Sequence, residues 1–418
     1  MKKYLILAVA AVTVMAACSK VEADYSSMPD VKIGYQVANY ATQTKADPTE
    51  HSFLTELADM GVTSNQAFKS IAYLNGDNGN GGTTLQTFYA TSPETISWDA
   101  TNKQWAPSHD YYWPKSPNSD LDFFSWYDYT TGAADPALSY NGTNATMTWA
   151  NRTVDLKSDI LFADVAFHQT KNKKNNPAYG FDSVSEGVPT LFHHALAQVR
   201  FCVKIKDNCD KKEDSKNAGN YTFWEVKLSA VKIADNKVHK NGTLTLTVAD
   251  PDAGQNNTPE AWTSAAWSNA STPAYAATAS EWFTTDYATG TEALTTEYHN
   301  ISATGQMKDD FIAVRPQAVG DDMTLGFKMT IVTKYGTALA TATTLNTEVI
   351  DVTTYAGTAP YTATGIQLNA MTGAPAEWAM NHKITYNIII DPSTSTILYD
   401  PAVENWASEQ TATVNVPE

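Results

Sequence analysis

The strongest structural signal in this sequence is an alternation of apolar and polar side chains along short segments. In the first of them, Val31, Ile33, Tyr35 and Val37 are the apolar members. This alternation is typical of a β-strand with one buried face. The sequence shows no long amphipathic helix and no strand–helix alternation, so we expect an all-β chain and not a Rossmann or barrel enzyme. Further strands of this kind are predicted at Val199–Ile205, Trp224–Ile233, Thr243–Val248, Phe311–Val314, Met323–Thr333 and Ile384–Ile390.

Turn residues divide these strands. The glycine-rich segment 75–82 lies between the apolar stretches Ala72–Leu74 and Leu85–Tyr89. Since glycine adopts positive φ angles at little cost, we predict a hairpin with its tip at this segment. Phe53–Met60 is the best candidate for a short helix.

The N-terminus has the features of a bacterial lipoprotein export signal. Lys2 and Lys3 are followed by an apolar run that ends in two alanines directly before Cys18. The run is too short to span a bilayer and resembles a lipobox, in which the cysteine receives lipid and the preceding signal is removed. We predict a signal peptide over 1–17 and lipid attachment at Cys18, which leaves a soluble body on a lipid tether. The alternative is an ordinary signal peptide with an incidental cysteine.

The charge of the chain limits its partners. It has 45 Asp and Glu against 28 Lys and Arg, a formal net charge of -17. Such a field repels phosphate backbones, so we expect no nucleic-acid partner. The hydrophobic residues, 43% of the chain, suffice for a sizeable core.

The length of 418 residues suggests more than one domain. The polar stretch 171–177 and the Glu186-Gly187 pair precede a new apolar strand, which predicts a boundary there. We expect the signal peptide at 1–17, an N-terminal β-sandwich at 18–186, and a C-terminal β-sandwich with long loop insertions at 187–418.

Motifs that carry chemistry are missing from the sequence. It has no G-x-S-x-G, P-loop or H-E-x-x-H motif. His193 and His194 would point to opposite faces of a strand, so they cannot bind one metal ion together and are interpreted as packed or edge residues. Asp120 and Asp122 could place two carboxylates on one face, but a solvated edge is the more common explanation in an acidic protein. We expect no enzymatic activity, no metal and no cofactor.

Two cysteines remain besides Cys18. Cys202 lies in an alternating strand, and Cys209 follows it seven residues later. A disulfide between them would need a chain reversal, so we favour two free or buried thiols.

Five groups of residues, in order along the chain, carry a resemblance to a known family. Each motif is weak alone, but together they lie behind a lipobox and extend over nearly the whole chain. The sequence therefore resembles the fimbrillin (Mfa-like) family of Bacteroidales surface lipoproteins. The groups are Tyr111–Pro114 with Leu121–Tyr127, Asp159–Ala163, Val188–Phe201, Phe311–Gln317, and Lys383–Ile390 with Pro401–Trp406.

The resemblance implies a fold, a function and a location. The fold would be two tandem transthyretin-like β-sandwiches, and the protein would be a structural subunit (pilin) of a fimbria that serves adhesion. In the family, a lipidated precursor reaches the outer membrane, and a surface protease removes the first strand. A strand from another fimbrial subunit then fills the groove. Here the removable strand would be Val31–Val37.

The processing site departs from the family pattern. The family commonly has an arginine after the first strand, whereas this chain has no arginine before Arg152 and carries Lys45 at the corresponding place. We predict cleavage between Lys45 and Ala46. The alternative is that the lysine is only a solvated loop residue and the strand stays, as in a fimbrial anchor or accessory lipoprotein.

The C-terminal segment Thr411–Val416 is the candidate donor strand. Ala412, Val414 and Val416 would share one face of it. It either completes the sheet of a neighbouring subunit or pairs within its own chain as a last edge strand.

Aromatic residues suggest a further alternative. Exposed aromatic rings can stack on sugars, which would make the chain a glycan-binding surface lipoprotein with host or bacterial glycans or proteins as partners. Packing in the core is the more common role of such rings in sheets. The cluster consists of Trp105, Tyr111, Tyr112, Trp113, Trp126 and Tyr127.

Overall fold

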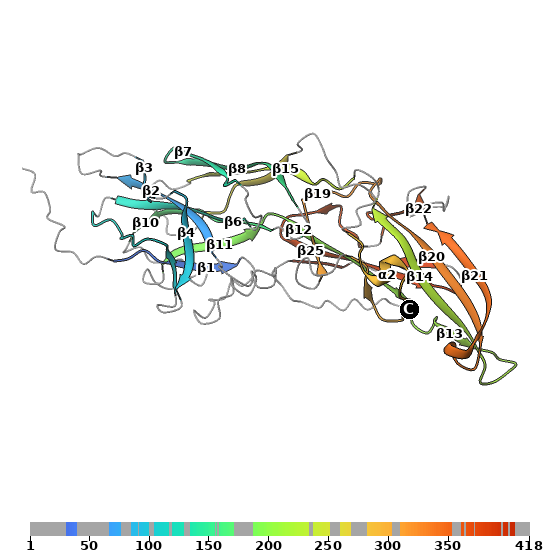
Figure 1. The fold of residues 1–418 in the computed structure, drawn as a ribbon. Helices are drawn as coiled ribbons and strands as arrows, with labels where there is room; N and C mark the ends of the chain where they lie inside the picture. Colours follow the sequence, from blue (N-terminus) through green and yellow to red (C-terminus); the bar gives the residue numbers. More distant parts are fainter. Residues whose placement is uncertain are drawn as a thin grey trace, which may run out of the picture.

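The computed structural model of the chain is an elongated, almost entirely β-stranded molecule (Figure 1). The predicted all-β fold class is confirmed, since α2 (Asp286–Thr289) is the only α-helix within the described ranges. None of the helices found in these ranges has the length and apolar character needed to cross a membrane. The structure describes residues 31–39, 67–76, 85–90, 92–99, 104–116, 119–128, 134–154, 156, 159–170, 187–233, 237–250, 260–268, 282–302, 310–352, 361–362, 365–371, 373–393, 396–399 and 402–405.

One sheet closes on itself at one end of the molecule. Its strand order is β10-β6-β9-β11-β1-β5-β4-β2-β3, and β2 pairs with β6 as well, so the strands from β6 to β2 form a ring. We call this ring the closed sheet. A sandwich was predicted, and the closure is an addition that the sequence did not indicate. The bounds are β1 (Tyr35–Asn39), β2 (Ala67–Gly76), β3 (Gln86–Thr87), β4 (Glu94–Asp99), β5 (Gln104–Pro107), β6 (Ser119–Asp128), β9 (Ile160–Ala163), β10 (Ala166–Gln169) and β11 (Val188–His194).

The closed sheet has apolar residues on both faces. Inside the ring lies a core that includes Ile33, Tyr35, Phe68 and Phe123, which we call the ring core. A second sheet covers part of the outside and forms a flank core with it, so β6 is buried on both faces. Its order is β16-β15-β8-β7, with bounds β7 (Ala137–Tyr140), β8 (Asn144–Thr153), β15 (Asn241–Ala249) and β16 (Ser264–Ser268).

The other end of the molecule has a core of its own between two further sheets. One sheet contains β12 (Ala197–Ile205), β17 (His299–Asn300), β18 (Ile312–Val314), β25 (His382–Asp391), β26 (Thr396–Tyr399) and β27 (Ala402–Asn405). The facing sheet contains β13 (Lys211–Glu213), β14 (Tyr221–Ile233), β20 (Thr324–Gly336), β21 (Thr343–Asp351), β22 (Tyr361–Thr362) and β23 (Gly365–Gln367). Smaller elements are the pair β19 (Gln317–Ala318) and β24 (Glu377–Trp378), and the 3-10 helix η6 (Leu339–Thr341).

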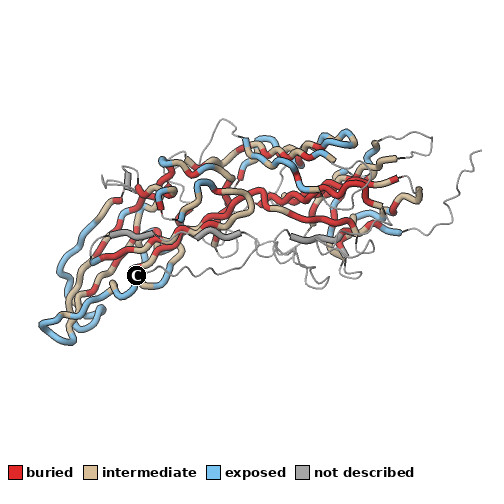
Figure 2. The backbone as a smooth tube through the Cα atoms, turned by 180° about the vertical axis from the view of Figure 1, so that it is seen from behind, coloured by how far each residue is buried: buried red, intermediate tan, exposed pale blue. Residues whose placement is uncertain are grey.

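The two ends are joined through shared strands. β11 and β12 follow one another along the long axis, separated only by residues 195–196 (Figure 1). In the segment at β18, Phe311 and Ala313 lie in the ring core, whereas Ile312 and Val314 lie in the core of the other end. Buried backbone accordingly runs along the middle of the molecule (Figure 2). Strands on both sides of residue 187 share sheets, because β11 pairs with β1 and β15 pairs with β8.

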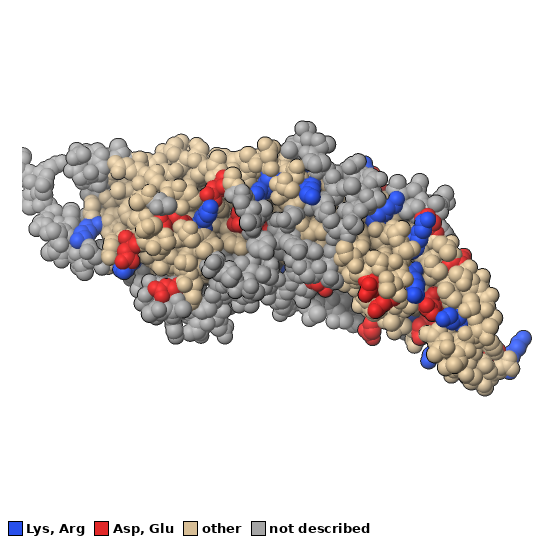
Figure 3. Space-filling view, viewed as in Figure 1, with Lys and Arg blue, Asp and Glu red and all other residues tan. Residues whose placement is uncertain are grey.

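Most predicted strands are present. The six later segments correspond to β12, β14, β15, β18, β20 and β25, and Tyr73 of β2 pairs with Thr87 of β3 as the predicted hairpin requires. The predicted helix Phe53–Met60 lies outside the described residues. Cys202 and Cys209 are free thiols, as predicted, and burial raises the pKa of Cys202. On the face shown in Figure 3, basic and acidic side chains are interspersed and form no basic patch among the described residues.

Candidate functional site

The candidate site is the position of β1 within the closed sheet. On one side β1 pairs in parallel with β11, from Tyr35 opposite Val188 to Asn39 opposite Phe192. On the other side it pairs antiparallel with β5. The residues before β1 extend this pairing through the Ile33 amide, which donates to the Tyr111 carbonyl at 2.8 Å. The segment 31–39 thus has backbone partners on the β5 side up to Tyr35 and on the β11 side from Gly34 onward, and we call the space that it fills the slot.

The side chains of this segment alternate as predicted. Ile33 and Tyr35 are each 2% exposed and belong to the ring core, whereas Val31 is 43% exposed. The predicted inward face is thus confirmed for Ile33 and Tyr35 and is wrong for Val31, which lies at the open end of the slot. Only the backbone of Val37 is described.

Tyr35 ends in a chain of buried hydroxyl groups. Its hydroxyl donates to the Oγ of Ser70 at 3.0 Å and makes a short hydrogen bond with the hydroxyl of Tyr89. Ser70 also accepts a hydrogen bond from Ser125 at 3.0 Å. Burial raises the pKa of Tyr35, so its hydroxyl stays protonated at neutral pH. The slot therefore has a polar floor, formed by Ser70, Ser125 and Tyr89 on three different segments.

A buried carboxylate lies behind this floor. Glu94 is 0% exposed and receives hydrogen bonds from Ser108, His109 and Tyr111. Although burial alone raises its pKa, these hydrogen bonds together lower it. Tyr111 in turn packs against Tyr89 with the two rings tilted, at a centroid distance of 4.6 Å. The Glu94 carboxylate thus holds Tyr111 in place, and Tyr111 in turn packs against Tyr89 of the floor.

Gly187 allows the backbone of the slot strand to come close. Its φ is +105°, and a Cβ atom there would lie 2.5 Å from the carbonyl oxygen of Gly34. The same carbonyl accepts a hydrogen bond from the Val188 amide at 2.8 Å. Only glycine fits at this crossing, because any side chain would push against the backbone of residues 34 and 35.

Several predicted site residues lie outside the described ranges. These are the lipidation site Cys18, the processing residues Lys45 and Ala46, and the donor residues Ala412, Val414 and Val416. The described C-terminal strands β26 and β27 both run antiparallel to β25 of their own chain.

The aromatic cluster is part of the core. Trp105, Trp113 and Trp126 are 4%, 6% and 1% exposed, and Tyr127 is 8% exposed. Their rings are covered by the ring core and the flank core and are not available for stacking on a sugar. Tyr112, at 40%, is the exposed member.

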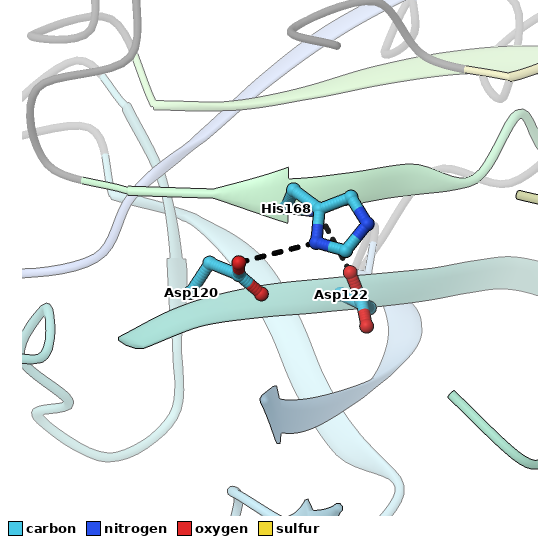
Figure 4. A group of neighbouring side chains, drawn as sticks. All are labelled: Asp120, Asp122 and His168. Carbon is cyan, nitrogen blue, oxygen red and sulfur yellow. Dashed lines mark hydrogen bonds and ion pairs between the residues drawn. The ribbon is translucent and has the colours of Figure 1, made fainter. Parts of the chain in front are cut away.

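A charged network joins the closed sheet to the sheet that covers it. Figure 4 shows its members on the closed sheet, Asp120, Asp122 and His168. His168 Nδ1 lies 3.1 Å from Asp120, and its Nε2 lies 2.5 Å from Asp250. Asp122 accepts hydrogen bonds from the His168 amide and from Tyr140, both at 2.7 Å. Asp122 is completely buried, so a solvated edge is wrong for this residue.

The charges of this network follow from its contacts. The Asp120 carboxylate, helped by Asp250, raises the pKa of His168 to about 9, although burial opposes the shift. Burial raises the pKa of Asp122. The carboxylates of Asp120 and Asp122 and one ring nitrogen of His168 lie within 4.8 Å of one another, a spacing that would suit a metal. Both ring nitrogens face carboxylates, however, and an imidazolium has no lone pair for a metal, so we interpret the group as an ion-pair network.

The sequence did not indicate the partners of the other histidines. His193 contacts Asp164 at 2.8 Å and His194 contacts Asp159 at 2.7 Å. The two rings thus reach different carboxylates, in agreement with the prediction that they do not act together. Asp159 and Asp164 flank β9. Their position next to this apolar strand was the one feature of the sequence that could have indicated buried carboxylate partners for the two histidines.

Comparisons with known proteins gave matches among solved structures. No family model matches the chain, and no curated protein matches it. The chain is similar to a fimbrial protein from Bacteroides vulgatus, with a TM-score of 0.48 and 16% identity over 90% of this chain and 100% of that one. It is also similar to a candidate cell adhesion protein from Bacteroides uniformis, with a TM-score of 0.35 and 14% identity over 91% and 99%. These neighbours are fimbrial and adhesion proteins.

A third similar structure is the tip fimbrial protein Mfa3 from Porphyromonas gingivalis, with a C-terminal truncation. Its TM-score is 0.27, at 8% identity over 90% of this chain and 100% of that one.

Proposed function

We propose that the chain is a structural subunit of a bacterial surface fimbria that serves adhesion, and that it assembles by exchange of its first strand. The observation that carries the proposal is the position of β1, inserted between β11 and β5 rather than next to a strand adjacent in sequence. In the proposal, β1 is the strand that a strand from a neighbouring subunit replaces.

The energetics of the empty slot support the same proposal. Loss of residues 31–39 opens the closed sheet and exposes the ring core where Ile33 and Tyr35 were buried. Burial of apolar surface contributes about 25 cal/mol per Å², and the flanking strands have backbone groups ready to pair. An extended strand from a neighbouring subunit satisfies both needs at once.

The sequence motifs support the route to the surface. In the proposal, Cys18 carries lipid that holds the precursor in the outer membrane, and a surface protease cuts between Lys45 and Ala46. The segment Thr411–Val416 is then the strand that this chain donates to a neighbour. The protein is not an enzyme and needs no cofactor in this role.

A second candidate is a fimbrial anchor or accessory lipoprotein that retains β1. The observation in its favour is the burial of Ile33 and Tyr35, with Tyr35 hydrogen-bonded to the polar floor. A glycan-binding lipoprotein has less support, because Trp113 and Trp126 are buried.

Mass spectrometry of the N-terminus separates the two candidates. We expect the chain from sheared surface material to begin at Ala46, and the chain from outer membranes to include a form that begins at acylated Cys18. A Lys45→Ala variant should lose the short form and the sheared filaments with it. If the wild type begins only at Cys18 and stays in the membrane, the subunit proposal is wrong and the anchor remains.

A further inference from the structure

We propose that the slot selects its occupant by a tyrosine, and that the strand it accepts comes from a different subunit that carries a tyrosine at the place of Tyr35. This inference rests on the proposed strand exchange and names the partner in it. The evidence is the chemistry of the floor, the shape of the walls, the fixed register and the composition of the chain's own donor segment.

The floor of the slot requires a hydroxyl group. Ser70 is 0% exposed and Tyr89 is 3% exposed, and both bond to the hydroxyl of Tyr35. An occupant without a hydroxyl at this point removes a donor from Ser70 and a partner from Tyr89. Ser70 keeps the hydrogen bond from Ser125, so the hydroxyl of Tyr89 is the group that loses its partner. A buried polar group that loses its partner weakens binding about tenfold, because water does not reach it.

The walls of the slot require an aromatic ring. The Tyr35 ring makes edge contacts with Phe68 and Phe123, at centroid distances of 5.5 and 5.8 Å. Phe68 also packs against Phe192, so these rings form a continuous wall. A smaller side chain would leave a void among rigid rings that are themselves held by neighbours. Serine or threonine would supply a hydroxyl, but its side chain is shorter than that of tyrosine. It would leave the void and would not reach Ser70 and Tyr89.

The register of the occupant is fixed by the backbone. Parallel pairing to β11 sets Tyr35 opposite Val188. The backbone of the slot strand comes closest at Gly187, where the residue before the tyrosine must pass. A slip by one residue would turn the side chains to the other face, and a slip by two would move the hydroxyl away from Ser70. The occupant therefore needs an apolar residue at the place of Ile33 and a tyrosine two positions later.

The chain's own C-terminal segment does not meet this requirement. Residues 406–418 contain no tyrosine, and the inward residues of the candidate donor are Ala412, Val414 and Val416. In the slot of an identical copy, these side chains would leave the void, and they would leave the Tyr89 hydroxyl without the hydrogen bond that Tyr35 makes. The chain therefore gives its strand to one kind of neighbour and takes a strand from another, and it does not form a filament of identical copies.

Peptide exchange into the full chain tests this inference. A specific protease site replaces residues 41–46, the folded chain is cut there, and the released first segment is displaced by excess labelled peptide. The peptides are the sequence 31–39, its Tyr35→Phe and Tyr35→Ala variants, and the chain's own 407–418. A Lys32→Ala peptide is the matched control, because Lys32 makes only an exposed ion pair with Asp110.

We expect the wild-type and Lys32→Ala peptides to bind equally. The Tyr35→Phe peptide should bind about tenfold more weakly, and the Tyr35→Ala and 407–418 peptides at least a hundredfold more weakly. Equal binding of the Tyr35→Phe peptide, or tighter binding of 407–418 than of 31–39, overturns the tyrosine requirement and leaves strand exchange intact. Failure of the wild-type peptide to enter an emptied slot overturns strand exchange itself, and the inference with it.

Discussion

The Gly187→Ala variant is expected to unfold with a free energy roughly 3–4 kcal/mol lower than that of the wild type. At φ +105° the alanine is strained, which costs about 1–2 kcal/mol. In addition, its Cβ would lie 2.5 Å from the Gly34 carbonyl oxygen, so β1 must move away and the hydrogen bond from the Val188 amide is lost. Chemical denaturation measures the total effect, and amide exchange at Val188 shows whether β1 has moved.

The Gly142→Ala variant is the matched control for this effect. Gly142 also has a positive φ, +93°, but a Cβ atom there would contact nothing within 4 Å. It should therefore show only the backbone strain, about 1–2 kcal/mol, and leave exchange at Val188 unchanged. Equal destabilisation by the two substitutions would mean that the slot tolerates the extra atom. Because the clash is with backbone, Gly187→Ala should also weaken every peptide in the exchange experiment, whatever its sequence.

The second large effect is expected at His168. Its pKa is about 9 in the folded protein against 6.5 when unfolded, so the folded state holds the proton more tightly. The resulting stability is fully present below pH 6.5 and is lost as the pH rises through 9. This difference between the folded and unfolded pKa values corresponds to about 3 kcal/mol of stability. A His168→Gln variant should be less stable by about this amount at pH 6, and the difference from wild type should shrink towards pH 9.5.

The carboxylates around His168 give this prediction its sign. Asp120, Asp122 and Asp250 surround the ring, and Tyr140 contributes a neutral hydroxyl. A His382→Gln variant is the control, because the Nδ1 of His382 contacts the Met380 carbonyl. It separates the loss of the His168 contacts from the effect of a histidine-to-glutamine change elsewhere in the chain. A constant difference between His168→Gln and wild type across this pH range would show that the histidine is neutral in the network.

Side-chain alternation predicted the strands well and the sheet order poorly. The pattern at Ile33 and Tyr35 identified a buried face, because one face of a strand repeats every second residue. The alternation carries no information on which strands become neighbours. The ring closes through the pairing of β2 with β6, whose paired residues are 43 or more positions apart in the chain. The available signal was the segment Leu121–Tyr127, which is apolar except for Asp122 and Ser125, since a strand buried on both faces is apolar at successive positions.

The polar part of the site was beyond sequence reasoning for a similar reason. Asp122 reads as a surface carboxylate until its partners are known, and these are 18 residues away at Tyr140 and 46 residues away at His168. The hydroxyl floor beneath Tyr35 likewise joins residues 35 to 55 positions apart. Long-range hydrogen bonds of this kind have no local pattern, so only the folded chain reveals that Tyr35 is more than an apolar residue.

The parallel arrangement of β1, β11, β12 and β25 has a mechanical consequence. The five residue pairs of β1 with β11 lie along the same line as the eight pairs of β12 with β25, and a continuous backbone connects β11 to β12. A force that pulls the slot strand along its axis therefore loads these pairs in shear, all at once, and not one after another as in unzipping. The alternating insertion of β18 into two cores resists bending at the same joint. Tension applied to one end of the molecule is thus carried to the other along strand axes, the direction in which a β-sheet is stiffest.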